Sequence, residues 1–152
     1  MEINNRLQYL YGMPMFAITV SIVPIIENGV LLVESEEYEK NKAYKFPSAF
    51  VKAGVETIQF AAVRCMKETT NIVLKKGDLM PVDFRSDPTR SQGGNIVDFG
   101  FVCFLDKQYD NYNKAIWKEV DFEKKCMIEK LNFFMDHNLL LERAIEISGI
   151  LK

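Results

Sequence analysis

Apolar residues in the first part of the chain are grouped as they are in β-strands. Residues 16–26 are rich in Ile and Val, and a second apolar run, residues 30–34, follows an Asn-Gly turn at residues 28–29. An Asn-Gly pair between two such runs favours a tight hairpin, because both residues tolerate positive φ angles. We therefore predict two adjacent antiparallel strands. Pro24 has no backbone N–H and cannot donate a hydrogen bond to a neighbouring strand, so it indicates an edge position or a bulge in the first strand.

A helical period follows in the middle of the chain. Apolar residues between Thr57 and Thr70 recur every three or four positions, which predicts an amphipathic helix over that range. Asn71 is suited to the left-handed conformation that closes a helix. Before this helix we expect a charged loop over residues 34–45, a short strand near residues 50–51 and a turn at Gly54.

The second half of the chain predicts three strands and two helices. Residues 96–105 are almost continuously apolar and aromatic, which is typical of a central strand buried on both faces. Residues 86–95 form a polar loop with Asp-Pro and Gly-Gly breakers, a candidate functional rim. The predicted strands cover residues 80–84, 96–105 and 115–120, and the predicted helices cover residues 123–132 and 136–150.

Composition excludes several classes of protein. The chain has 152 residues, of which 48% are hydrophobic, so we expect residues 1–152 to form a single folded domain. The net charge is −2 and Lys and Arg do not cluster, so we expect no nucleic-acid partner.

The cysteines and the N-terminal residues bear on location. The three cysteines have neither a disulfide framework nor zinc-site spacing, which is typical of free thiols in a reducing compartment. The N-terminus lacks the pattern of a signal peptide, and residues 16–26 are too few to span a bilayer. We therefore expect a soluble, cytoplasmic protein without a membrane partner.

The most informative segment is residues 46–72, FPSAFVKAGVETIQFAAVRCMKETTNI. Glu56 lies eight positions before Arg64, and Glu68 lies four positions after it. This spacing resembles the Nudix box, G-x5-E-x7-R-E-U-x-E-E-x-G-U, where U is aliphatic. Four positions depart from the motif: Phe50 stands at its first glycine, Cys65 and Thr69 at two of its glutamates, and Asn71 at its last glycine.

The resemblance extends beyond the box. Residues 84–105 are similar to the loop and strand of ADP-ribose-type Nudix proteins and of Nudix-like ligand domains in bacterial regulators. AIWKEVDF and LNFFMDHNLLLERAI resemble the tryptophan-containing strand and the Asp-His-led last helix of those proteins. The resemblance implies an α/β (α+β) Nudix fold with a mixed sheet, the box helix and C-terminal helices. The regulators also carry a winged-helix DNA-binding domain, and we expect that function not to transfer because the chain ends before one could fit.

The resemblance also implies a chemistry, namely cleavage of a nucleoside-linked diphosphate with divalent ions, usually magnesium, held by glutamates of the box helix. Positions 65, 68 and 69 lie within about one helical turn, so carboxylates there would converge. Only Glu68 carries one, and a thiol or a neutral hydroxyl is a poor magnesium ligand. Glu56 and Glu68 are therefore the candidate catalytic and metal-binding residues, as remnants with weak or no magnesium binding. Asp98, Asp87 and Glu119 are the candidate replacement carboxylates, and glutamates restored at positions 65 and 69 should increase magnesium-dependent cleavage.

Other residues are candidates for ligand contact or for support of the box. Arg85 and Arg90 flank or lie in the polar loop, where guanidinium groups can hold phosphate oxygens with paired hydrogen bonds. Phe46 is a candidate for stacking on a planar base, and Asp98 is the conspicuous polar residue of the central strand. Arg64 and Gly54 take the structural positions of the box in the resemblance.

The leading interpretation is a domain that binds an ADP-ribose-like or nucleotide-sugar-like diphosphate, with pyrophosphate hydrolysis weak or lost. Two alternatives stay open: a divergent but active diphosphohydrolase, and a fold kept as a protein-interaction or homodimer module.

Overall fold

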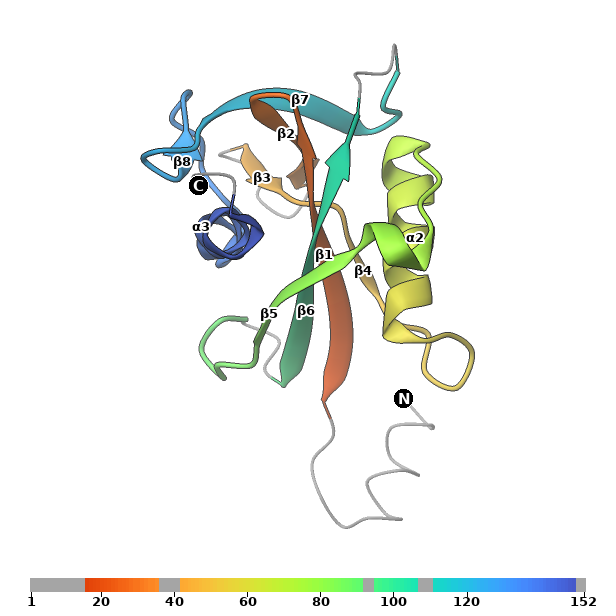
Figure 1. Ribbon diagram of the computed structural model, residues 1–152. Coiled ribbons are helices and arrows are strands. Elements are labelled where there is room, and N and C mark those ends of the chain that lie inside the picture. Colours follow the sequence, from red (N-terminus) through yellow and green to blue (C-terminus); the bar gives the residue numbers. More distant parts are fainter. Residues whose placement is uncertain (1–15, 36–41, 92–94, 107–110, 150–152) are drawn as a thin grey trace.

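The computed structural model describes residues 16–35, 42–91, 95–106 and 111–149, and it shows a curled mixed sheet between two helices (Figure 1). The strands are β1 (Ala17–Ile26), β2 (Gly29–Ser35), β3 (Ala43–Lys45), β4 (Ser48–Phe50), β5 (Met80–Arg85), β6 (Ile96–Leu105), β7 (Ala115–Asp121) and β8 (Cys126–Met127). The helices are α2 (Ile58–Thr70), the short 3₁₀ helix η1 (Lys76–Asp78) and α3 (His137–Ser148). The α+β fold class predicted from the sequence is confirmed.

Strand β1 lies at the centre of the sheet. The strand order is β5-β6-β1-β2-β7-β8, with β4 paired to β1 and β3 paired to β2. β1 runs parallel to β6 along its whole length and turns back into β2 as the predicted antiparallel hairpin, in which Ile26 pairs with Gly29. Parallel and antiparallel neighbours on one strand bring distant segments of the chain to the same end of the sheet.

The prediction that Pro24 marks an edge or a bulge was wrong. Pro24 lies within the central strand, paired in regular register with Cys103 of β6. Ile22 N–H donates to Pro47 O on the side of β1 where β4 lies. Because backbone N–H groups alternate between the two sides of a strand, the nitrogen of Pro24 points to the same side. The β4 pairing ends at Ser21 and the β2 pairing begins at Ile25. The missing N–H therefore falls in the gap between the two partners, where the ladder loses no hydrogen bond.

Helix α2 begins and ends with the residues that the sequence indicates. Thr57 Oγ1 accepts a hydrogen bond from Phe60 N–H at 3.2 Å, which satisfies one free donor of the first turn. Asn71 has φ 65° and donates its N–H to Lys67 O at 3.0 Å, the left-handed closure predicted above. One face of α2 packs on the sheet, and its buried residues are Ala61, Ala62, Cys65, Met66 and Thr70.

The sheet has a hydrophobic core on each face. One core joins α2 to β1 and β6, and its largest members include Ile22, Leu31 and Met66. The other lies between the sheet and α3 and includes Phe46 and Leu140. Among the described residues, no helix is long and apolar enough to cross a membrane.

Two sequence-based expectations fail near β7 and β3. Residues 123–132 do not form the predicted helix: they make turns and the short strand β8, which pairs with β7. Lys125 has φ 55°, which interrupts a right-handed helix, and Asp121 Oδ1 accepts from Lys124 N–H in the turn instead. Residues 43–45, expected in a loop, form β3 because they pair with β2. The rest of that predicted loop, residues 36–41, lies outside the described residues.

Gly29 is required where the hairpin meets β7. A Cβ at this position would lie 2.5 Å from Lys118 O and as close to the indole of Trp117. Trp117 cannot easily move away, because its Nε1–H donates to Ile26 O at 3.2 Å. We expect Gly29→Ala to lower the free energy of unfolding by about 1–3 kcal/mol, the usual cost of overpacking. Urea denaturation measures this cost.

Gly77→Ala is the matched control, because a Cβ there meets nothing within 4 Å. Its effect should stay within about 0.5 kcal/mol. Equal stabilities of the two variants would contradict the close approach at Gly29.

Candidate functional site

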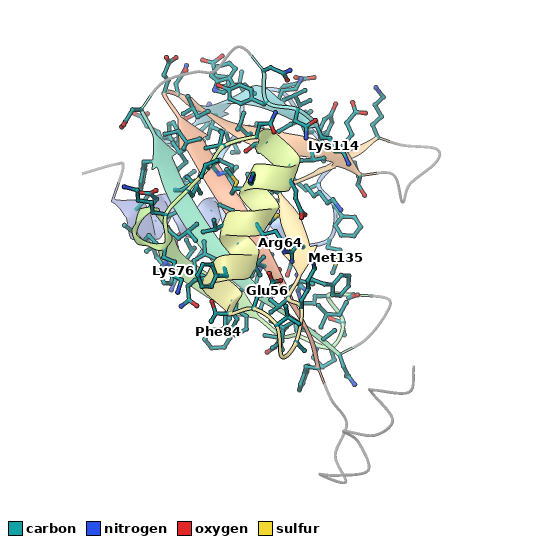
Figure 2. All side chains as sticks on the ribbon, turned by 90° about the vertical axis from the view of Figure 1, so that its right-hand side faces the viewer. Glu56, Arg64, Lys76, Phe84, Lys114 and Met135 are labelled. Atoms are coloured by element: carbon teal, nitrogen blue, oxygen red, sulfur yellow. The ribbon has the colours of Figure 1, made fainter. Side chains whose placement is uncertain are left out.

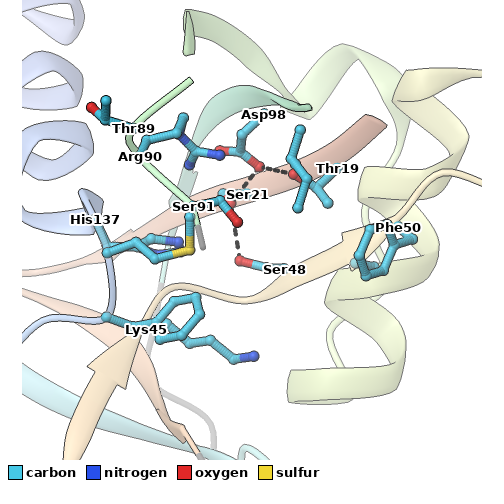
Figure 3. Close-up of a pocket in the computed structure, with 14 residues that line it drawn as sticks. Thr19, Ser21, Lys45, Ser48, Phe50, Thr89, Arg90, Ser91, Asp98 and His137 are labelled. Atoms are coloured by element: carbon cyan, nitrogen blue, oxygen red, sulfur yellow. Dashed lines mark hydrogen bonds between the residues drawn. The ribbon is translucent and has the colours of Figure 1, made fainter. Parts of the chain in front are cut away.

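A cavity of about 620 Å³ opens beside the central strands, within the usual size range of small-molecule sites (Figure 3). It is bounded by β1, the end of β3, β4 and the start of β6, by residues 89–91 of the polar loop, and by Phe134, Met135 and His137 around the start of α3. These segments are far apart in the chain. The parallel pairing of β1 with β6 and the docking of α3 bring them together.

The floor of the cavity is a buried polar cluster around Asp98, which is 2% exposed. Its Oδ1 accepts hydrogen bonds from the hydroxyls of Thr19 at 2.6 Å and Ser21 at 2.9 Å. The Ser21 hydroxyl also lies 2.9 Å from that of Ser48 on β4, as the dashed lines in Figure 3 show. Asp98, the conspicuous polar residue of the central apolar strand, is thus the centre of a hydrogen-bond network that joins β1, β4 and β6.

Arg85 and Arg90 are held by two aspartates. Arg85 forms ion pairs with Asp98 and, through Nη1, with Asp136 Oδ1 at 2.5 Å. Arg90 donates to both oxygens of Asp136 at 2.9 Å. Their side chains are only 9% and 5% exposed. Burial favours the neutral acid at Asp136, but the hydrogen bonds from Arg90 and the charges of both arginines hold its pKa below the ordinary value. The positive charges of the two arginines are therefore matched before any ligand enters.

His137, the first residue of α3, contributes a neutral imidazole. It is 3% exposed, lines the cavity, and accepts a hydrogen bond at Nδ1 from Phe46 N–H at 2.9 Å. Burial is the main cause that lowers the pKa of His137 far below its ordinary value. With Nδ1 acting as acceptor, the proton of the neutral ring is on Nε2. Phe46 itself is fully buried, stacks on this ring and does not line the cavity.

Lys45 is a cation that sequence reasoning missed. It lies at the end of β3, lines the cavity, and its Nζ is 5.5 Å from the centre of the Phe134 ring. Figure 3 shows it reaching toward the cavity from β3. In the described part of the chain, no carboxylate lies within salt-bridge distance of its ammonium group. The only sequence signal was a lysine two positions before Pro47 in a segment assigned to a loop.

The box residues form a separate cluster along α2 and the loop before it, and Figure 2 shows Glu56 and Arg64 there. Arg64 donates to both oxygens of Glu56, at 2.6 and 3.0 Å, and to Glu68 at 3.2 Å. Glu56 also accepts from Lys52 N–H, and the hydrogen bond from Arg64 is the main cause that lowers its pKa to about 2. Gly54, at φ 75°, forms the turn that brings Glu56 back toward the helix. This cluster meets the cavity at one residue, Phe50, whose side chain lines the cavity and whose carbonyl accepts from Arg64 at 2.9 Å.

The donor set of the box does not fit a magnesium ion. Cys65 is 1% exposed and burial raises the pKa of its thiol to about 11, so it carries no charge at neutral pH. Thr69 is neutral, and the carboxylates of Glu56 and Glu68 are engaged by Arg64. Magnesium requires several oxygen ligands in octahedral geometry. Within the described ranges no group of three or more His, Cys, Asp or Glu side chains could hold a metal ion.

The candidate replacement carboxylates have other partners. Asp98 is held by Arg85 and two hydroxyls, as described above. Asp87 accepts from the N–H and hydroxyl of Thr89 within the polar loop, and Glu119 accepts from Asn28 at the β1–β2 hairpin. None of them is directed toward Glu68 by these contacts.

The candidate ligand-binding residues thus divide in three ways. Asp98 and Arg90 line the cavity, Arg85 lies behind it as the link between the two aspartates, and Phe46 is in the core. Their roles toward a ligand stay predictions. Sequence reasoning did not single out His137 as a ligand-contact residue, because nothing along the chain indicates which residues it faces.

Comparisons of the sequence find no matching family model and no matching curated protein. Comparison of the structure finds many solved chains, among them Shewanella oneidensis NrtR complexed with a 27mer DNA. That structure is 17% identical with a TM-score of 0.68, and the match covers 86% of this chain and 61% of NrtR. The prediction that excluded a nucleic-acid partner was therefore wrong. Net charge averages over the whole chain and does not rule out DNA contact by a protein that carries this fold.

Two further solved structures match nearly the whole chain. A MutT/nudix family protein from Enterococcus faecalis is 16% identical with a TM-score of 0.71, over 95% of this chain and 69% of that protein. The NUDIX domain of Shewanella oneidensis NrtR, complexed with ADP ribose, is 17% identical with a TM-score of 0.70, over 93% of this chain and 97% of that domain. These similarities, together with the spacing of Glu56, Arg64 and Glu68, identify the fold of this protein as the Nudix fold.

Proposed function

We propose that this chain is a Nudix-fold domain that binds a nucleoside diphosphate linked to another moiety, ADP-ribose-like or nucleotide-sugar-like, with magnesium-dependent hydrolysis weak or lost. The observation that carries the proposal is the box cluster: Arg64 engages both remaining glutamates, and the buried thiol of Cys65 replaces a third carboxylate. Without several free carboxylates the box lacks the negative charge that concentrates magnesium beside a diphosphate.

The cavity supports the binding part of the proposal. Its volume suits a small organic ligand, and it combines apolar and aromatic walls from Phe50 and Phe134 with a few buried polar groups. One neighbour of the same fold is complexed with ADP ribose, which suggests the first ligand to test. The buried free thiols Cys65 and Cys103 agree with our expectation of a reducing compartment such as the cytosol.

A thermal-shift experiment tests the proposal with ADP-ribose, UDP-glucose and NAD, each with magnesium and with EDTA. Binding to the folded state alone raises the stability by about 2.7 kcal/mol at a ligand concentration of 100 Kd. We expect at least one of the three ligands to raise the melting temperature equally with magnesium and with EDTA. Phosphate release coupled to a phosphatase should stay near background.

A pair of loop variants shows whether the ligand enters this cavity. Thr89 is exposed and lines the cavity, so Thr89→Trp should fill its mouth and remove the thermal shift. Ser86→Trp, exposed in the same loop and outside the cavity lining, is the matched control and should keep the shift. Absence of a shift with all three ligands would refute the binding proposal and favour an interaction module. Magnesium-dependent phosphate release would instead support the active hydrolase.

A further inference from the structure

Of the charged side chains around the cavity, the aspartates and arginines pair with one another, and the remaining cation is Lys45. Asp98, Arg85, Asp136 and Arg90 form a linear chain of ion pairs in that order, so the two negative and two positive charges cancel. Lys45 lines the same cavity without a carboxylate partner among the described residues. An anionic ligand group therefore gains most from contact with Lys45, because contact with either arginine would compete with a buried aspartate.

His137 presents a donor to the same cavity. Its Nδ1 is used by Phe46 N–H, which leaves the Nε2–H as the free donor of the ring. The side chain is 97% buried, and no described residue accepts a hydrogen bond from Nε2. Because His137 lines the cavity, a ligand oxygen or ring nitrogen there can accept a hydrogen bond from this N–H.

The Phe134 ring connects the two groups. Lys45 Nζ lies 5.5 Å from its centroid, and the His137 ring lies edge-on to it with centroids 6.0 Å apart. The cation and the neutral donor therefore flank one aromatic surface. A ligand that lies against this surface can reach one group with an anionic end and the other with an uncharged polar end.

We infer that Lys45 and His137 determine which ligand this cavity binds, and that the ligand is a phosphorylated nucleoside. Its anionic group contacts Lys45, and an uncharged acceptor of the base or ribose accepts a hydrogen bond from the His137 Nε2–H. The inference rests on the proposed function and adds the orientation of the ligand. Neither residue is assigned a catalytic role. The Asp98–Arg85–Asp136–Arg90 network holds the cavity wall and the start of α3 in place.

The test separates the ligand contact of His137 from its structural hydrogen bond. His137→Asn keeps an acceptor for Phe46 N–H through Oδ1 and removes the Nε2 donor, whereas His137→Gln can place an amide N–H near the Nε2 position. Calorimetry with ADP-ribose, or with UDP-glucose if that ligand stabilises the wild-type chain better, gives the affinities. We expect binding to His137→Asn to weaken by about tenfold or more and His137→Gln to recover part of the loss.

Lysine variants test the other end of the ligand. Lys45→Met should weaken binding by about tenfold and reduce its dependence on salt. Lys42→Met is the matched control, because Lys42 is exposed, pairs with Glu34 and does not line the cavity. Its affinity should equal that of the wild type.

The single histidine of the chain allows a direct measurement. Imidazole ¹⁵N spectra of the untagged protein should show the proton on Nε2, and ligand should shift that resonance. This result does not require any variant to fold. A proton on Nδ1, or normal affinity in both His137→Asn and Lys45→Met, would overturn the inference while leaving the proposed function intact. Failure of the wild-type chain to bind any nucleotide would overturn both.

Discussion

Arg85→Met should lower the free energy of unfolding by about 3–5 kcal/mol, the cost of removing one partner from a buried ion pair. Asp98 would then be left at 2% exposure with only two hydroxyl donors, and Asp136 would lose one of its two arginines. Urea denaturation followed by tryptophan fluorescence measures the change, and Trp117 is the only tryptophan. The same variant should also loosen the wall of the cavity, because Arg85 links β6 to the start of α3.

Arg143→Met is the matched control for this prediction. Arg143 pairs with Glu146 on the surface of α3, with 52% of its side chain exposed. An exposed pair contributes little, so the control should stay within about 0.5 kcal/mol of the wild type. The double variant Arg85→Met with Asp98→Asn should lose less than the sum of the two single variants, because the second change removes the unpaired charge. A cost for Arg85→Met as small as that for Arg143→Met would show that the network does not stabilise the fold.

Cys65→Glu should destabilise the protein by about 3 kcal/mol or more, although the sequence motif suggests it as a restoration of the box. The side chain at this position is 1% exposed and belongs to the core between α2 and the sheet. A glutamate there is larger than cysteine and places a carboxylate among apolar residues, so burial should raise its pKa. Thr69→Glu should be tolerated better, since Thr69 is only half-buried.

The pH dependence identifies the cause. A glutamate whose pKa is raised on folding binds more protons in the folded state, so its cost is absent below the unfolded pKa and grows as the pH rises through the folded value. The penalty of Cys65→Glu should therefore shrink as the pH falls from neutrality toward about 4. In Cys65→Gln the new side chain has the size of glutamate but no charge, so the loss of stability should not change with pH. Parallel pH profiles for the two variants would show that size alone causes the loss.

Local sequence patterns predicted the elements that local interactions stabilise. The β1–β2 hairpin, the helix after Thr57 and the Asn71 closure all depend on residues a few positions apart, and each occurs where the sequence indicates. The turn of the hairpin is formed by Glu27 and Asn28, one position earlier than the predicted Asn-Gly pair, and Glu27 has the positive φ angle of 52°. The predictions over residues 123–132 and 43–45 failed for the opposite reason. β8 and β3 exist because β7 and β2 offer them hydrogen-bonding partners, and periodicity within the segment carries no information about those partners.

The candidate site shows the same division. The spacing of Glu56, Arg64 and Glu68 is a local helical property, and the sequence alone identified the box and its missing carboxylates. Asp98 could also be singled out, because a carboxylate in an apolar strand must find buried partners. Which partners these are was decided by tertiary structure: the link between Arg85 and Asp136 spans 51 positions, and that between Phe46 and His137 spans 91.

The sequence by itself therefore determined the fold class, the hairpin, the box helix and the shortage of carboxylates on it. Only the tertiary structure decided that the loop arginines are matched by aspartates, that His137 faces a cavity and that no carboxylate of a described residue pairs with Lys45 there. The reason is physical. Helix period, caps and turns depend on neighbours in the chain, whereas hydrogen-bond partners, burial and charge balance depend on neighbours in space.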